Sequence, residues 1–219
     1  MIIFMFSANV LDYVLHIGDY LKDAGPYIPL VVGIIVFVES GILLGFFLPG
    51  DSLLLSAGVI AAEGSTSLSI LLIVTLVAAI AGDQFGYFWG QFFGERIVEK
   101  KKLKFIKRKH LDNAHAFFEK NGGKSIILAR FVPIIRTFVP FTAGVVKMKY
   151  RSFVSYNIIG GTLWGVGVTL LGFLVGKTFG DKTEKYLLLI IAVVILISFI
   201  PVGVEVYKAK KNKKNEKVS

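Results

Sequence analysis

Cysteine is absent from this 219-residue sequence, and histidine occurs only three times, as His16, His110 and His115. The absence of cysteine excludes a disulfide framework and a thiolate metal site. Two of the histidines lie five residues apart in a basic stretch, so the three do not make a credible set of metal ligands. We therefore expect no metal and no cofactor.

Apolar residues dominate what is present. They make up 54% of the chain, aromatic residues make up 13%, and the mean hydropathy is +0.69. Soluble domains of this size rarely reach such an apolar fraction, which indicates an integral membrane protein. The apolar start, residues 1–10, has neither a basic region nor a small-residue cleavage site, so we do not read it as a cleaved signal peptide.

The net charge of +10 is distributed unevenly. Residues 95–124 hold ten lysines and arginines against four acids, the tail after Tyr207 holds six lysines, and residues 1–27 hold one lysine against three aspartates. Because the basic clusters flank hydrophobic stretches, the positive-inside rule explains them better than nucleic-acid binding. We expect both clusters to be cytoplasmic, the N-terminus to be external, and the basic segment to contact anionic lipid headgroups.

These patterns predict an all-α protein that crosses a membrane several times as a single membrane domain, residues 1–219. About three full transmembrane helices are expected, at residues 68–93, 152–176 and 186–207. The other predicted parts are an interfacial helix within 1–26 (residues 9–24), a first repeat at 27–94, a basic amphipathic cytoplasmic helix at 95–124, a second repeat at 125–180, and a lysine-rich cytoplasmic tail at 208–219.

Two apolar segments are interrupted by helix breakers. Pro49 and Gly50 interrupt residues 27–61, and Pro133 and Pro140 interrupt residues 125–145. We predict that each segment forms a re-entrant helical hairpin and that the two hairpins open to opposite sides of the membrane. Irregular backbone at membrane depth is tolerated only against protein or a wet cavity, so the hairpins should line something.

The two halves also resemble each other. Glu39 lies ten residues before Pro49 and Arg130 lies ten before Pro140, while residues 87–94 resemble residues 173–180 in their aromatic and glycine positions. Inverted repeats with broken helices around a midplane site are typical of transporters. The alternative is a chance resemblance between apolar, glycine-rich stretches.

Four charged residues in the broken segments are the candidate functional groups: Glu39, Asp51, Arg130 and Arg136. Each would cost roughly 2.5–3.5 kcal/mol near the bilayer centre. An arginine pair suits a phosphate, because guanidinium is always ionised and offers a planar fork of donors. Desolvation favours the neutral form of a carboxyl group, so the acids can carry protons. Alternatively, the arginines pair with the acids and only hold the hairpins together.

Asp83, in the first predicted full span, is a weaker candidate for the proton-carrying role.

Three motifs run through these segments in order. The first comprises Phe37, Glu39, Gly45, Phe47, Pro49, Gly50 and Asp51; the second comprises Gly82, Asp83, Gly86, Tyr87 and Gly90; the third runs from Ala129 to Gly144. Over roughly residues 25–180 the chain resembles the DedA membrane proteins of the SNARE-associated, VTT-domain superfamily.

The resemblance implies re-entrant hairpins, dependence on the proton-motive force and transport of lipid carriers. Some members of the family are linked to the return of undecaprenyl phosphate across the cytoplasmic membrane, and others to phospholipid flipping. The essential acids and arginines of the family match Glu39, Asp51, Arg130 and Arg136 in this sequence.

The leading hypothesis is a proton-coupled flippase in which Arg130 and Arg136 hold the phosphate of a lipid while Glu39 and Asp51 take up protons. A proton-coupled small-ion antiporter would use the same four charges. A membrane lipid phosphatase would need histidines near its arginines, and the nearest lie in the basic segment, so we expect no enzyme activity. The sequence leaves the lipid and the oligomeric state open.

Overall fold

The computed structural model describes residues 21–43, 45, 48–99, 126–127, 130 and 133–180. Every regular element in this part of the chain is helical, in agreement with the predicted all-α class. Most of the predicted 9–24 helix, the basic segment beyond Glu99, the 186–207 span and the lysine-rich tail lie outside the described residues.

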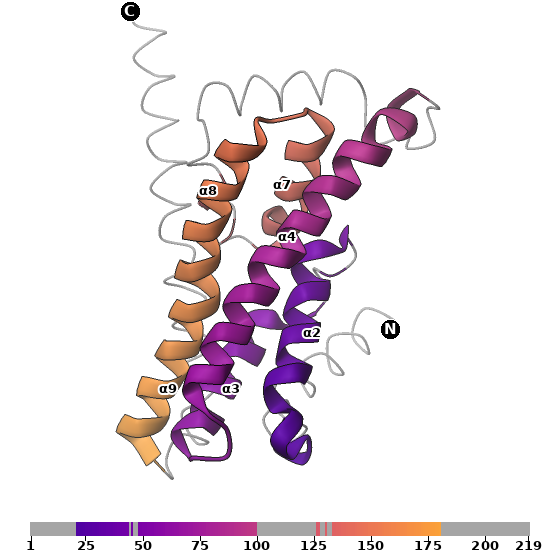
Figure 1. Cartoon of the computed structure of the whole chain (residues 1–219). Helices are drawn as coiled ribbons and strands as arrows, with labels where there is room; N and C mark the ends of the chain where they lie inside the picture. The colour runs from indigo at the N-terminus through magenta and orange to yellow at the C-terminus, as the bar shows by residue number, and fades with distance from the viewer. Residues whose placement is uncertain are drawn as a thin grey trace, which may run out of the picture.

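Two long helices run the length of the bundle (Figure 1). One is α4 (Leu68–Glu99). The other is assembled from α8 (Tyr150–Gly161), the π-helical turn η3 (Thr162–Val166) and α9 (Gly167–Phe179). Both are long and apolar enough to cross a membrane, over Leu68–Phe93 and Tyr150–Phe179. These helices coincide with the spans predicted at 68–93 and 152–176.

The first broken segment forms two shorter helices. The 3₁₀ turn η1 (Gly25–Tyr27) leads into α2 (Ile28–Gly41), and α3 (Gly50–Ala62) follows. Helix α2 ends because Ile42 has extended backbone angles, and Pro49 caps the start of α3 while its carbonyl accepts a hydrogen bond of 2.9 Å from the Ser52 hydroxyl. A Cβ at Gly50 would collide with the Glu39 carboxylate, so the close return of the chain requires glycine there.

The second broken segment departs from the prediction at one proline. Helix α7 (Pro133–Val145) begins at Pro133 but continues through Pro140, where we expected a break. A proline removes one backbone hydrogen bond, which neighbouring helices can compensate in a membrane bundle. Pro140 is buried, and a Cβ added at Gly86 of α4 would lie 3.4 Å from its ring. The proline therefore acts as a packing surface inside an intact helix.

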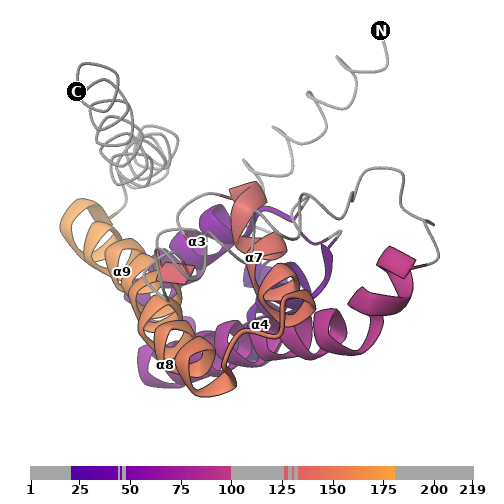
Figure 2. The same ribbon diagram turned by 90° about the horizontal axis from the view of Figure 1, so that it is seen from above.

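The short helices pack on opposite halves of the bundle. In Figure 1 α3 lies in the lower part of the bundle and α7 in the upper part; α3 packs against α9 (Figure 2), and α7 and α2 pack against α4. The view from above shows the helices surrounding a common interior (Figure 2). The inner ends of α3 and α7 consequently meet near the middle of the bundle.

Glycines allow α3 and α9 to approach at backbone distance. A Cβ at Gly58 would collide with the carbonyl oxygen of Thr169, and a Cβ at Gly172 would collide with the carbonyl oxygen of Leu55. Small residues four apart commonly permit such close contacts between membrane helices. The two helices therefore form a seam that tolerates no side chain at either glycine.

The contact between α7 and α4 repeats this seam. A Cβ at Gly144 would meet the carbonyl oxygen of Tyr87, and a Cβ at Gly90 would meet that of Phe141. In both seams, and on both helices of each seam, the glycine lies three residues after the residue whose carbonyl the partner glycine covers. The seams therefore make Gly90 equivalent to Gly172. The sequence match of residues 87–94 with 173–180 instead aligns Gly90 with Gly176, which lies about one helical turn further along α9.

Two apolar cores flank the charged interior. The larger core joins α2, α3, α4 and the region of Trp164, and includes Val36, Leu54 and Leu71. The smaller core lies between α4, α7 and α8, where Phe153 stacks on Tyr87 at 4.5 Å between ring centroids. The Tyr87 hydroxyl donates a hydrogen bond of 2.6 Å to the Met148 carbonyl and so ties the turn after α7 to α4.

The seam between α3 and α9 predicts opposite effects for two glycines of the same helix. Gly172→Ala should lower stability by about 1–3 kcal/mol, the usual cost of overpacking. Gly167→Ala should leave stability unchanged or raised, because an added Cβ would meet no atom within 4 Å. Thermal unfolding of both variants in detergent, followed by circular dichroism, checks this. Equal midpoints would contradict the seam.

Candidate functional site

Five charged side chains converge inside the bundle from widely separated parts of the sequence. Glu39 comes from α2, Asp51 from α3, Asp83 from α4 and Arg136 from α7, and Arg130 lies just before α7. Four of them are buried and Asp51 is partly buried, with 28% of its side chain exposed. All the charged residues singled out in the sequence therefore lie in one cluster.

Arg136 joins both helices of the first broken segment. Its Nη2 donates to Oε1 of Glu39, and its Nη1 donates to Oδ1 of Asp51 at 2.9 Å. The guanidinium fork is thus shared between two carboxylates that come from opposite sides of the break at Pro49. This ion pairing fastens α2 and α3 to α7.

Arg130 has a different acid as its partner. Its Nη1 donates to Oδ2 of Asp83 at 2.5 Å and to Oδ1 of Asn157 at 2.7 Å, and its Nη2 donates to the Ala79 carbonyl at 2.9 Å. From the sequence, Glu39 and Asp51 were the predicted partners of both arginines, and Asp83 was a weaker candidate. In the structure Asp83 is the ion-pair partner of Arg130.

Trp164 connects the two arginine environments. Its indole N–H donates to Oδ1 of Asp51 at 2.6 Å. Its ring lies 4.3 Å from Cζ of Arg136 and 5.8 Å from Cζ of Arg130, within the range of cation–π contacts. Trp164 is buried in the π-helical turn between α8 and α9, and such turns are frequent at functional sites.

Trp164 and Asn157 were not among the residues predicted from the sequence. Asn157 is fully buried, and its Nδ2 donates to the Ile80 carbonyl at 3.1 Å while its Oδ1 accepts from Arg130. A signal for it was present, because an amide within a predicted transmembrane span needs an internal partner. Trp164 carries no comparable signal, since a tryptophan is unremarkable in an apolar segment.

The cluster carries unequal charge and unused hydrogen-bonding capacity. Three carboxylates face two guanidiniums, so the set has one excess negative charge when all five groups are ionised. Within the described residues, Oε2 of Glu39 and Nε of Arg136 are buried without a hydrogen-bond partner. Such groups call for a functional explanation in a folded protein. The described part of the chain, which contains none of the three histidines, has no group of three acids placed to hold a metal ion.

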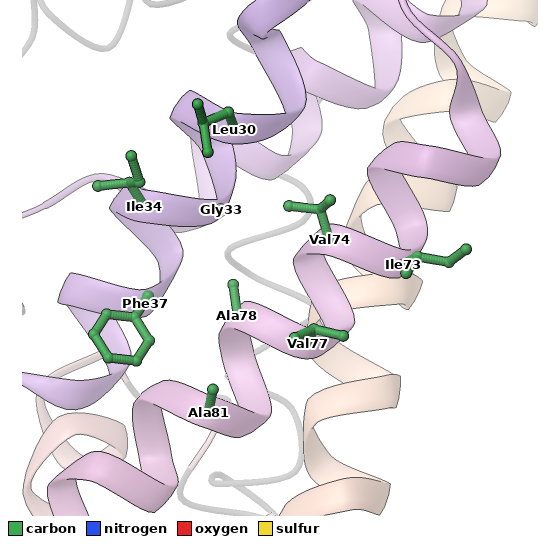
Figure 3. Close-up of a pocket in the computed structure, with 9 residues that line it drawn as sticks. All are labelled: Leu30, Gly33, Ile34, Phe37, Ile73, Val74, Val77, Ala78 and Ala81. Atoms are coloured by element: carbon green, nitrogen blue, oxygen red, sulfur yellow. The ribbon is translucent and has the colours of Figure 1, made fainter.

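An apolar groove runs along the outside of the bundle between α2 and α4 (Figure 3). Its volume is about 490 Å³, and it is lined by Leu30, Gly33, Ile34, Phe37, Ile73, Val74, Val77, Ala78 and Ala81. One end reaches Phe37 and Ala81, each two residues from an acid of the cluster. A neighbouring cavity of about 440 Å³ shares Leu30 and Val74 with the groove and extends it to the polar turn at residues 65–67.

Comparison with known proteins gives a consistent picture. Residues 48–174 match the VTT domain family. The chain is 39% identical to Protein DedA of Escherichia coli K12, over 92% of this chain and 94% of that protein. It is 42% identical to a membrane protein of Mycobacterium tuberculosis H37Rv, over 93% and 90% of the two chains. It is 30% identical to the inner membrane protein YqjA of E. coli K12, over 82% and 84%. No solved structure matches the chain.

The buried pair between Arg130 and Asp83 predicts a large stability loss when its negative partner is neutralised. Asp83→Asn leaves Arg130 buried without a counter-charge and should cost about 3–5 kcal/mol. Glu63→Gln is the matched control, because Glu63 pairs with Lys22 at 3.0 Å on the surface, where such pairs contribute about 0–1 kcal/mol. Unfolding in detergent measures both. Equal losses would contradict a strong buried pair.

Proposed function

We propose that this chain, which belongs to the DedA family of membrane proteins, moves a lipid phosphate across the cytoplasmic membrane and couples the movement to the proton-motive force. The cargo is undecaprenyl phosphate, in carrier recycling, or a phospholipid. The observation that carries the proposal is the buried Arg136 fork, which two carboxylates share inside a bundle of apolar helices.

A phosphate and the two carboxylates compete for the same N–H donors of Arg136. A guanidinium fork binds phosphate in the same bidentate manner as carboxylate. Phosphate oxygens and the oxygens of Glu39 and Asp51 cannot occupy the same Arg136 N–H groups at once. Binding of a lipid phosphate therefore requires the acids to release Arg136, and the free Nε of Arg136 adds a further donor.

Protons provide the release. Protonation of Glu39 and Asp51 removes the charges that hold Arg136, so uptake of protons from the side of higher proton concentration favours the phosphate-binding form. Asp83 is in a similar position relative to Arg130 and is the weaker candidate for the same role. When the phosphate leaves, the carboxylates lose their protons and return to the guanidinium.

The arrangement of the short helices supplies a route. In this proposal the segments around α2–α3 and α7 are opposed re-entrant hairpins, their tips meet at the charged cluster, and the 186–207 span completes three full crossings. The basic segment and the tail face the cytoplasm and the N-terminus faces outward. A shift of one hairpin relative to the other would expose the arginines to alternate sides.

The α2–α4 groove provides a place for the hydrocarbon chain. It is apolar and extends from the polar turn at residues 65–67 to Phe37 and Ala81, which lie at about the level of Glu39 and Asp83 along their helices. A lipid whose phosphate enters the cluster could leave its chain in this groove. The proposed cycle contains no bond breaking, and we propose no enzyme activity.

A flipping assay in proteoliposomes tests the proposal. Labelled polyprenyl phosphate and phosphatidylethanolamine are supplied with and without a pH gradient. We expect gradient-dependent movement of one lipid in the wild type and its loss in Arg130→Ala and Glu39→Gln. Arg136→Lys should be at least about tenfold slower although the charge is kept, because lysine lacks the planar fork. Arg151→Lys, on the exposed face of α8, is the control.

Normal transport in Arg136→Lys would contradict bidentate phosphate binding. Movement of neither lipid by the wild type would leave the cluster as a structural network or an ion pathway.

A proton-coupled small-ion antiporter is the second candidate, and the excess carboxylate of the cluster favours it. A site with three acids and two arginines can balance its charge with a bound cation or a proton. This function requires cation-dependent proton flux in vesicles without the lipid cargo. Absence of that flux would exclude it.

The groove separates the two candidates. Ile34→Trp should fill part of the groove and slow lipid movement several-fold. Leu174→Trp should leave lipid movement unchanged, because Leu174 lies on α9 and does not line the groove, and its similar exposure makes it a matched control. The exposed fractions are 55% for Ile34 and 58% for Leu174. The same proteoliposome assay measures both variants. If a small ion is the cargo, its flux should be the same in the two variants.

A further inference from the structure

Trp164 contacts the charged cluster in three ways at once. Its N–H holds Asp51, and its ring lies over the guanidiniums of both Arg136 and Arg130. Since both distances are measured to the same ring centre, the two guanidinium carbons lie within about 10 Å of each other. Trp164 is therefore the side chain common to both arginine environments.

The local fold positions this ring. Trp164 lies in the π-helical turn η3, which interrupts the regular hydrogen bonding between α8 and α9. Gly160, before the turn, makes room for Arg130, because a Cβ there would lie 3.2 Å from its Cδ. The long helix therefore accommodates Arg130 on the same segment that carries the indole.

We propose that Trp164 is a positioning residue that makes Arg130 and Arg136 one binding site for a single phosphate group. The inference rests on the proposed lipid-phosphate function and adds a residue and a stoichiometry to it: one phosphate per pair of arginines. Arg130, paired with Asp83, and Arg136, shared by Glu39 and Asp51, would otherwise present two independent sets of donors.

The physical reason lies in how an aromatic ring binds a cation. The ring attracts the guanidinium through its quadrupole and needs no N–H group to do so. The N–H edges, which bind oxygen, remain available to a ligand. Carboxylates hold the arginines in the ligand-free protein but must release them for phosphate, whereas the indole can keep its contact in both states. Trp164 therefore preserves the orientation of the arginines while their partners exchange.

The indole N–H has a second consequence. It donates to the same Oδ1 of Asp51 that accepts from Arg136. When Asp51 releases Arg136, the hydrogen bond to Trp164 keeps the carboxyl group within reach of its former partner. The acid can then recapture the guanidinium after the phosphate leaves.

Tryptophan fluorescence tests the proposal directly, because the chain contains only Trp89 and Trp164. Trp89 lies on the exposed part of α4 and contacts Phe85 and Phe93, so Trp89→Phe leaves Trp164 as the single emitter with the cluster intact. Titration of this purified variant with polyprenyl phosphate should shift or quench the emission and saturate at one phosphate per chain. Polyprenol without phosphate should give no change, and neither should polyprenyl phosphate added to Trp164→Phe, in which Trp89 is the emitter.

Substitutions supply the second measurement. Trp164→Leu removes the ring and should weaken binding of radiolabelled polyprenyl phosphate about two- to thirtyfold, the range that cation–π contacts are worth. Trp164→Phe keeps a ring and should bind within about threefold of the wild type. Phe153→Leu is the control for loss of a buried aromatic, since Phe153 lies on the same long helix but stacks on Tyr87. It should lower thermal stability without changing affinity.

The outcomes separate this inference from the proposed function. If the wild type binds and moves polyprenyl phosphate while the emission of Trp164 stays constant and Trp164→Leu binds normally, Trp164 is only part of the core and the inference is overturned. Saturation at two phosphates per chain overturns the single site. If the wild type binds no lipid phosphate, the proposed function itself fails.

Discussion

The desolvation of charge in an apolar bundle is the constraint on which the rest of the structure depends. Glu39, Asp83, Arg130 and Arg136 are buried where water cannot solvate them. Each arginine therefore needs an acid beside it, and each acid needs an arginine or a proton. This requirement draws the four helical elements and Arg130 to one point, although the paired residues are up to 97 positions apart in the sequence. The ion pairs of Arg136 hold α2, α3 and α7 together inside the bundle.

Glycine is the second condition for this arrangement. The acids and arginines can meet only if the helices that carry them approach closely, and the two seams of α3 with α9 and α7 with α4 are closed by glycines over backbone carbonyls. Gly50 likewise permits the chain to pass beside the Glu39 carboxylate. Charge pairing and close packing thus support each other: the seams bring the inner ends of α3 and α7 together, and the ion pairs join them.

The long helices and the charged segments could be predicted from the sequence, whereas the continuity of α7 could not. The long helices at 68–93 and 150–179, the interruption before Gly50 and the concentration of charge in broken apolar segments follow from hydropathy and from the helix-breaking residues. The continuity of α7 through Pro140 could not be foreseen, because a proline inside a helix is tolerated only when tertiary neighbours accommodate it. The two halves resemble each other in sequence, but the two glycine seams align them in a register that differs from the sequence match by about one helical turn.

The sequence by itself determined the family, the helical class and the identity of the charged residues, because composition and motif spacing are properties of the linear chain. Only the tertiary structure decided which acid meets which arginine. Asp83 pairs with Arg130 and both remaining acids share Arg136, since pairing depends on where helix faces come to lie after packing. The same reason applies to Trp164, which is an ordinary apolar residue in the sequence and touches both arginines only in the folded bundle.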